Sequence, residues 1–107
     1  MSWYVKTERF NKKALKSPKS YRREVIKEHK RWVESIKNNG REIYSGYLIN
    51  ENQLPGGGGL LLIKAISFED AKTIILKDPM ITNDLVDWEL NEWVQLGEDI
   101  SSRIKFT

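Results

Sequence analysis

Residues 20–40, SYRREVIKEHKRWVESIKNNG, contain the clearest helical pattern in this chain of 107 residues. Apolar and ring-bearing side chains recur there at intervals of three and four, which places them along one side of an α-helix. They are Tyr21, Val25, His29, Trp32 and Ile36, with Ile26 and Val33 beside them. Asn38-Asn39-Gly40 should end the helix, because Gly and Asn tolerate the left-handed conformation that follows many helices. The sequence therefore predicts a helix over about 20–38.

Four other segments have patterns typical of β-strands. Residues 2–10 alternate and are rich in aromatic and β-branched side chains. Residues 41–50 form a second candidate, in which Gly46 suggests a bulge or a close approach to the backbone. Residues 60–66, LLLIKAI, are apolar on both faces and predict a central strand. Residues 85–96 alternate well enough for a fourth strand.

A second helix is predicted between the third and fourth strands. Ser67 is a suitable N-cap, and Glu69 and Asp70 follow in the first turn. Ala71, Ile74 and Ile75 should form its buried side. Lys77-Asp78-Pro79 should end it, because the residue before a proline disfavours the helical region.

Three segments are predicted to be connections or ends. Residues 11–19, NKKALKSPK, form a basic loop in which Pro18 argues against a continuous helix. Residues 50–59, NENQLPGGGG, are expected to be a flexible hairpin loop without regular structure, able to cover a pocket. They lack the GxxxxGK[ST] pattern of a phosphate-binding loop. Residues 97–107 are a tail that fits either a short helix or an extension.

The resulting order, β-α-β-β-α-β, is that of the ferredoxin-like arrangement. It predicts an α+β domain with a four-stranded antiparallel sheet and two helices on one face. The length fits a single domain over residues 1–107. The four Trp residues and many aliphatic side chains exceed what one helical layer obviously covers, so we expect the other sheet face to meet a second sheet.

The composition excludes several classes of site. The chain has no cysteine, which removes disulfides, thiolate nucleophiles and iron–sulfur clusters, and its single histidine disfavours a metal site built from protein ligands alone. No signal peptide is recognisable at the N-terminus, and the longest apolar run, residues 60–63, is too short to span a bilayer. We therefore expect a cytoplasmic protein without a membrane partner and without a metal or other cofactor.

The charge is unevenly distributed. Residues 1–41 contain thirteen Lys and Arg and four Glu, whereas residues 42–107 contain five basic and eleven acidic residues. This raises nucleic-acid binding as an alternative, through Lys12, Lys13, Lys16, Lys19, Arg22 and Arg23. The predicted third strand lacks the aromatic side chains with which RNA-binding domains of this topology stack bases. We therefore favour the other interpretation, that the two parts complement each other within a subunit or across a dimer, over a nucleic-acid partner.

His29 and Asp78 are the two candidate catalytic residues. His29 lies on the predicted buried stripe, where an imidazole must find hydrogen-bonding partners. It is either a structural histidine bonded to the backbone or to water, or a proton-transfer group facing a cleft. Asp78 is either an ordinary helix stop or the carboxylate that orients His29. Both helices of this fold lie on one sheet face, which allows the two to meet.

The chain resembles the YCII-related family over nearly its whole length. The matching pieces are His29 and the later Gly40, the SGY step at 45–47, GGGGLLLIKA at 56–65, the helix opening SFEDA at 67–71, and DPM at 78–80. Two features depart from the family pattern. Tyr47 replaces the usual proline, and the basic segment 11–19 is longer than typical and could cover the cleft or bind an anion.

The resemblance implies a homodimer joined sheet to sheet, the dimeric α+β barrel, with a His29–Asp78 dyad in a cleft. Relatives include a ring-dehalogenating enzyme, and the wider superfamily includes muconolactone isomerases and small monooxygenases. We expect a small enzyme that isomerises a small organic molecule or eliminates HX without a cofactor. Ser45, Gly46, Tyr47 and Trp88 would shape its pocket. The alternative is a binding module for a small ligand or an acidic partner, in which His29 and Asp78 are not paired.

Overall fold

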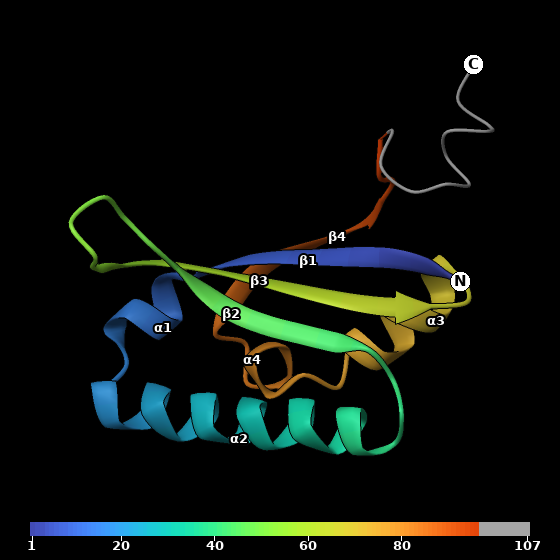
Figure 1. Cartoon of the computed structure of the whole chain (residues 1–107). Helices are drawn as coiled ribbons and strands as arrows, with labels where there is room; N and C mark the ends of the chain where they lie inside the picture. The colour runs from blue at the N-terminus through green and yellow to red at the C-terminus, as the bar shows by residue number, and fades with distance from the viewer. Residues whose placement is uncertain (97–107) are drawn as a thin grey trace.

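The computed structural model describes residues 1–96 and has the predicted α+β architecture (Figure 1). Its strands are β1 (Ser2–Phe10), β2 (Ile43–Ile49), β3 (Pro55–Ala65) and β4 (Val86–Trp93). They form a four-stranded sheet in the order β2-β3-β1-β4, with every neighbouring pair antiparallel. The helices are α1 (Lys12–Lys16), α2 (Lys19–Asn38), α3 (Phe68–Ile75) and α4 (Pro79–Thr82). The ferredoxin-like fold class is confirmed, and β3 lies between two strands as predicted.

All four helices lie on one side of the sheet, and the opposite side carries none (Figure 1). We call this opposite side the open face. Because side chains alternate along a strand, it displays the residues that lie between the buried positions. They include Trp3, Val5, Tyr44, Leu62 and Trp93. In the described part of the chain, no helix combines the length and apolar character needed to cross a membrane.

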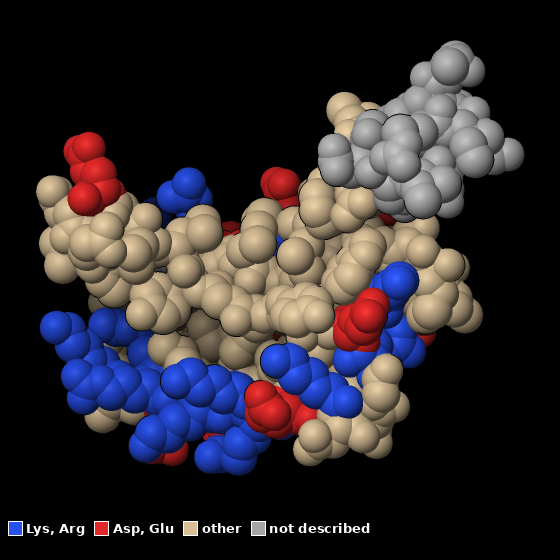
Figure 2. All heavy atoms as spheres, viewed as in Figure 1, with Lys and Arg blue, Asp and Glu red and all other residues tan. Residues whose placement is uncertain are grey.

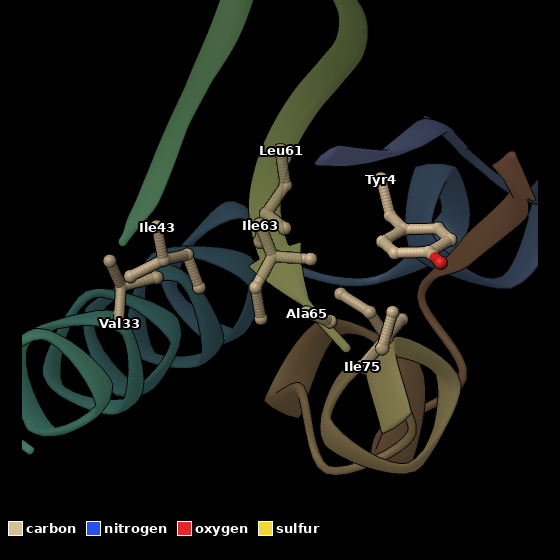
Figure 3. Close-up of a cluster of buried hydrophobic side chains, with 8 residues drawn as sticks. Tyr4, Val33, Ile43, Leu61, Ile63, Ala65 and Ile75 are labelled. Atoms are coloured by element: carbon tan, nitrogen blue, oxygen red, sulfur yellow. The ribbon is translucent and has the colours of Figure 1, made fainter. Parts of the chain in front are cut away.

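The main core fills the space between the sheet and helices α2 and α3. Figure 3 shows Ile63 of β3 among side chains from the other elements, and its side chain is fully buried. The cluster comprises Tyr4, Val33, Ile43, Leu61, Ile63, Ala65, Ala71 and Ile75. A second cluster joins α1, α2, α4 and the start of β4, and comprises Ala14, Val25, Met80, Leu85 and Val86. Together the clusters fix α2 across one half of the sheet and α3 across the other.

Local signals at the helix ends behave as the sequence indicates. Ser67 caps α3, since its hydroxyl accepts a hydrogen bond from the Asp70 backbone N–H at 3.0 Å. The Asp70 carboxylate in turn accepts from the backbone N–H of Ile66 at 3.2 Å, which resembles a reciprocal capping box. Gly40 follows α2 with a φ of 89°, in the left-handed region that favours glycine. Both boundaries are therefore determined by short local patterns.

The prediction of an irregular loop over residues 50–59 was wrong. The turn covers only residues 50–54, where the Asn50 side chain accepts backbone N–H groups of Asn52 and Leu54. Strand β3 already begins at Pro55, and Gly58 and Gly59 pair with Arg9 and Glu8 of β1. Gly59 also pairs with Tyr47 of β2. A β-ladder uses only backbone groups, so glycines can pair when a neighbouring strand holds them in register.

Three smaller features also differ from the sequence-based expectation. The basic segment 11–19 contains the short helix α1, capped by Asn11, before the chain breaks at Pro18. The chain after α3 forms a further turn, α4, rather than only a helix stop. Gly46 is not a bulge, because the register shift in β2 lies between Tyr47 and Ile49. The tail predicted over 97–107 lies outside the described residues.

The basic residues gather over α1 and α2, along the lower part of Figure 2. Among the described residues, two ion pairs of Lys or Arg join the basic first part of the chain to its acidic second part. Lys6 pairs with Asp78, and Arg41 pairs with Asp70 at 3.1 Å. The complementarity expected from the charge distribution thus exists at these two places, while much of the positive charge on α2 faces solvent.

The buried position of Ile63 predicts a large loss of stability in Ile63→Ala. Removing a buried isoleucine side chain typically costs about 2–5 kcal/mol. Ile66→Ala is the matched control, since Ile66 is 74% exposed three residues further on. Its free energy of unfolding should change by less than about 0.5 kcal/mol. Urea denaturation of both variants measures the difference, and equal losses would contradict this description of the core.

Candidate functional site

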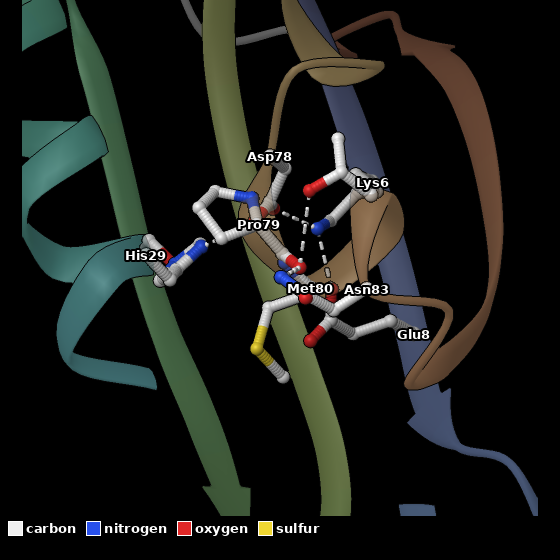
Figure 4. A network of polar contacts seen from close by, with 9 residues as sticks. Lys6, Glu8, His29, Asp78, Pro79, Met80 and Asn83 are labelled. Carbon is white, nitrogen blue, oxygen red and sulfur yellow. Dashed lines mark hydrogen bonds and ion pairs between the residues drawn. The ribbon is translucent and has the colours of Figure 1, made fainter. Parts of the chain in front are cut away.

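A buried carboxylate, Asp78, lies at the centre of a polar network on the helical side of the sheet (Figure 4). Its side chain has no exposed surface. One oxygen, Oδ2, lies 2.5 Å from Lys6 Nζ of β1. The other, Oδ1, lies 2.8 Å from His29 Nδ1 of α2 and accepts the Met80 backbone N–H at 2.9 Å. The Asp78 carboxylate therefore contacts donors from β1, α2 and α4, and its contact with the Met80 N–H caps α4.

These contacts determine the ionisation of Asp78. Burial by itself raises the pKa of a carboxyl group, because it disfavours the charged form. For Asp78 this effect is outweighed by the hydrogen bond from His29 and the positive charge of Lys6, and its pKa lies below the ordinary value. Asp78 is therefore a carboxylate at neutral pH, and a carboxylate can only accept hydrogen bonds.

His29 connects Asp78 to Ser45 of β2. Its Nδ1 must carry a proton to donate to the Asp78 carboxylate. Its Nε2 lies 2.8 Å from Ser45 Oγ, so the neutral ring accepts the serine hydroxyl there. The ring also lies beside Trp32, with centroids 5.7 Å apart. This arrangement selects one tautomer and leaves the basic nitrogen of His29 directed at Ser45.

Lys6 and Glu8 belong to the same network, although the sequence analysis did not identify them. The Lys6 side chain is only 1% exposed, and its Nζ lies 2.5 Å from an oxygen of both Asp78 and Glu8. Alternation in β1 places Tyr4, Lys6 and Glu8 on one strand face, and Tyr4 is buried. The sequence could have indicated the burial of Lys6 only through its position on the same strand face as the core residue Tyr4. This indication is weak, because alternate polar positions in a strand usually face water.

A cavity of about 700 Å³ lies between α2 and the sheet, next to this network. Figure 2 shows the surface hollowed between the sheet and the basic helix. Its wall includes His29, Ser45 and Glu8 among mostly apolar atoms. The full lining is Glu8, Phe10, Ile26, His29, Lys30, Val33, Glu34, Lys37, Ser45, Gly46, Tyr47, Pro55, Gly58, Gly59, Leu60, Leu61 and Met80. A small organic ligand would fit a cavity of this size.

Most of the residues expected to shape the pocket lie on its wall, but Trp88 does not. Ser45, Gly46 and Tyr47 line the cavity from β2. Trp88 lies on β4, beyond β1, and packs against both hydrophobic clusters. It is a core residue because β1 separates its strand from the cavity. The glycine-rich segment contributes to the wall as part of β3 and not as a covering loop.

Comparisons with known proteins support the fold. No protein-family model and no curated protein sequence matches the chain. Among solved structures, it is similar to 5-chloro-2-hydroxyhydroquinone dehydrochlorinase from Burkholderia phenoliruptrix, in complex with 2,5-dihydroxybenzoquinone. The TM-score is 0.65 at 16% sequence identity, over 89% of this chain and 95% of the other. At this identity the similarity establishes the α+β fold alone.

The lowered pKa of Asp78 predicts a specific acid dependence of stability. A group with a depressed folded-state pKa stabilises the protein above its unfolded value, about 3.9, and this contribution is lost as pH falls through the folded value. Asp78→Asn should therefore flatten the fall in stability below pH 4. At pH 7 it should cost about 3 kcal/mol, because it breaks a buried charged network.

Asp84→Asn is the matched control for this measurement. Asp84 is exposed and has a φ of 55°, which asparagine also tolerates. Thermal unfolding monitored from pH 2 to 7 should give the control nearly the wild-type profile. An Asp78→Asn profile that overlays the wild type would contradict the organising role of this carboxylate.

Proposed function

We propose that the cavity is the active site of a small enzyme that uses His29 as its general acid and base. The observation that carries this proposal is the position of His29, with Asp78 on one ring nitrogen and the cavity-lining Ser45 on the other. Asp78 orients the ring and stabilises the imidazolium that forms on proton uptake. This is the pairing expected of a proton-transfer dyad.

The chemistry that suits this site is elimination or isomerisation. In elimination, His29 Nε2 takes a proton from a carbon or hydroxyl of the substrate, and the electron pair released forms a new double bond as halide departs. In isomerisation, His29 returns the proton to a different atom. Neither step needs an oxidant or reductant. A positioned proton-transfer group contributes about 10²–10⁴-fold, so the reaction must be intrinsically easy.

The substrate class we propose is a small cyclic compound with a leaving group or a carbonyl. The solved structure of similar fold is named a dehydrochlorinase and is complexed with 2,5-dihydroxybenzoquinone. A largely apolar cavity of about 700 Å³ accommodates a compound of that kind. Within residues 1–96, no three His, Asp or Glu side chains cluster as a metal site, and the proposed steps use the protein side chains alone.

A non-catalytic binding module is the second candidate, although the form expected from the sequence, in which His29 and Asp78 are not paired, is contradicted by their 2.8 Å contact. It is favoured by the hydrogen bonds at both ring nitrogens of His29, which leave neither nitrogen free. Catalysis requires the Ser45 hydroxyl to turn away from Nε2, or to pass the proton between Nε2 and the substrate. A binding module requires neither movement and would hold its ligand against an intact network.

Substitution of His29 separates the two candidates. His29→Gln can still bond to both Asp78 and Ser45, but it cannot exchange a proton near neutral pH. For an enzyme, kcat/KM should fall about 10²–10⁴-fold while the unfolding temperature stays close to that of the wild type. The assay follows halide release from chlorinated hydroxyquinones, and deuterium uptake from D₂O by substrates without halide.

Glu28→Gln is the control on the same helix, because Glu28 is exposed and lies outside the cavity lining. It should keep the wild-type rate. Ligand binding by the wild type without turnover of any compound would support the binding module. A His29→Gln protein that unfolds would show that the histidine is primarily structural.

We further propose that the chain forms a homodimer through the open face. The rings of Trp3 and Tyr44 stack there with centroids 6.0 Å apart, and Trp93 is 45% exposed beside them. Leu62 lies between Tyr44 and Val5 across the strands. A second copy of this face would remove these aromatic and aliphatic groups from water.

Sedimentation of the protein should therefore give twice the 12.5 kDa mass of one chain. Leu62→Lys places a charge at the centre of the open face and should yield a folded monomer. Leu76→Lys is the control, since Leu76 is 44% exposed on the helical side, and it should remain dimeric. A monomeric wild type at micromolar concentration would refute the dimer.

A further inference from the structure

A glycine forms part of the cavity floor and lies between two residues with polar side chains. In the sheet register, Gly59 of β3 pairs with Glu8 on one side and with Tyr47 on the other. All three line the cavity. A Cβ atom at position 59 would lie 3.2 Å from both Cγ and Oε2 of Glu8. The absence of a side chain at Gly59 therefore leaves room for the Glu8 carboxylate to lie over the floor.

The Glu8 carboxylate has hydrogen-bonding capacity that the fold does not use. Its Oε1 is buried and lies 2.5 Å from Lys6 Nζ as an ion pair without the geometry of a hydrogen bond, so Oε2, which lies next to Gly59, is the oxygen left for a ligand. Lys6 also pairs with Asp78, so one positive charge serves two carboxylates. The described contacts therefore leave an unsatisfied acceptor on the Glu8 side of the network.

We infer that Glu8 determines the ligand specificity of this cavity by accepting a hydrogen bond from a hydroxyl or ammonium group of a ligand lying over Gly59. This inference rests on the proposed function, because it assigns the chemistry of the ligand in the same cavity. Lys6 holds Glu8 in place through Oε1 and leaves Oε2 toward the floor. A ligand without a donor would leave a partly buried carboxylate unsatisfied, which is the basis of strong discrimination.

The contacts of the network also determine how a ligand held by Glu8 is oriented in the cavity. Ser45, His29, Asp78, Lys6 and Glu8 form a continuous series of contacts, and both of its ends line the cavity. A donor held by Glu8 therefore fixes one part of the ligand while another part faces Ser45 and His29. Glu8 acts as a positioning residue, and it takes no part in the proton transfer.

The test measures the preference for a donor without requiring turnover. The probes are resorcinol, which has two O–H donors, and 1,3-dimethoxybenzene, which has the same ring and no donor. Dissociation constants come from NMR titration of the full ¹⁵N-labelled chain. The wild type should bind resorcinol at least about tenfold more tightly, the effect expected of one hydrogen bond to a charged acceptor. In Glu8→Gln, which keeps the shape but loses the charge, the preference should fall below about threefold.

Glu28→Gln is the matched control, because Glu28 is an exposed carboxylate that lies outside the cavity lining. The donor preference should survive this change. Loss of the preference in Glu28→Gln, its survival in Glu8→Gln, or a wild type that binds neither probe would each overturn the inference. If Glu8→Gln does not fold, Gly59→Ala replaces it, since the added methyl group occupies the floor beside Glu8. Both probes should then bind more weakly, and unchanged dissociation constants would contradict this location.

The outcome also separates this inference from the proposed function. If His29→Gln abolishes the donor preference and Glu8→Gln retains it, His29 is the acceptor, which contradicts the role of Glu8 and leaves the enzyme proposal intact. If Glu8 controls the preference but no substrate is turned over, the specificity assignment stands and the enzyme proposal fails.

Discussion

The buried carboxylate of Asp78 is the interaction on which the arrangement of the site depends. A carboxylate without exposed surface is stable in a protein only when donors and positive charge surround it. Here the donors come from β1, α2 and the first turn of α4. Each of these elements is therefore held relative to the others by one side chain. The orientation of His29, and through it the contact with Ser45, follows from this single buried charge.

The same network explains why a lysine is buried on the helical side of the sheet. Lys6 occupies a position that would otherwise hold an apolar residue between Tyr4 and the cavity. Its charge is balanced by Asp78 and Glu8, and replacing it would leave two carboxylates close together. Buried ion pairs of this kind contribute little net stability compared with a well-packed apolar core. Their presence beside a cavity is more typical of a site that positions charged groups for a ligand.

The two faces of the sheet differ in the groups that they carry. The helical face contains the core, the cavity and the polar network, and the open face displays aromatic and aliphatic groups. Gly59, near the start of β3, forms part of the cavity wall on the helical face. Because Gly59 has no side chain, β3 pairs with β1 and β2 at this position while space remains above it for the cavity. A bulkier residue at 59 would close that space from below.

By itself, the sequence determined the order of the four strands and of helices α2 and α3, because these elements depend on local patterns. The apolar stripe of α2, the serine cap of α3 and the alternation of β1 each act over a few residues. The candidate pair His29 and Asp78 was also recognisable, through an imidazole on an apolar stripe and a resemblance in motif order. Local rules failed at the glycines, which have no intrinsic preference for a strand. Gly58 is held there by pairing with β1, and Gly59 by pairing with both β1 and β2.

Only the tertiary structure decided which polar groups meet. Lys6, His29 and Asp78 are far apart in the chain, and their contacts depend on how α2 and α4 pack against β1. It also placed Trp88 in the core, because the strand order puts β1 between β4 and the cavity. Such contacts arise from packing between distant segments, where burial changes both the charge state and the partners of a side chain. No local pattern in the sequence carries that information.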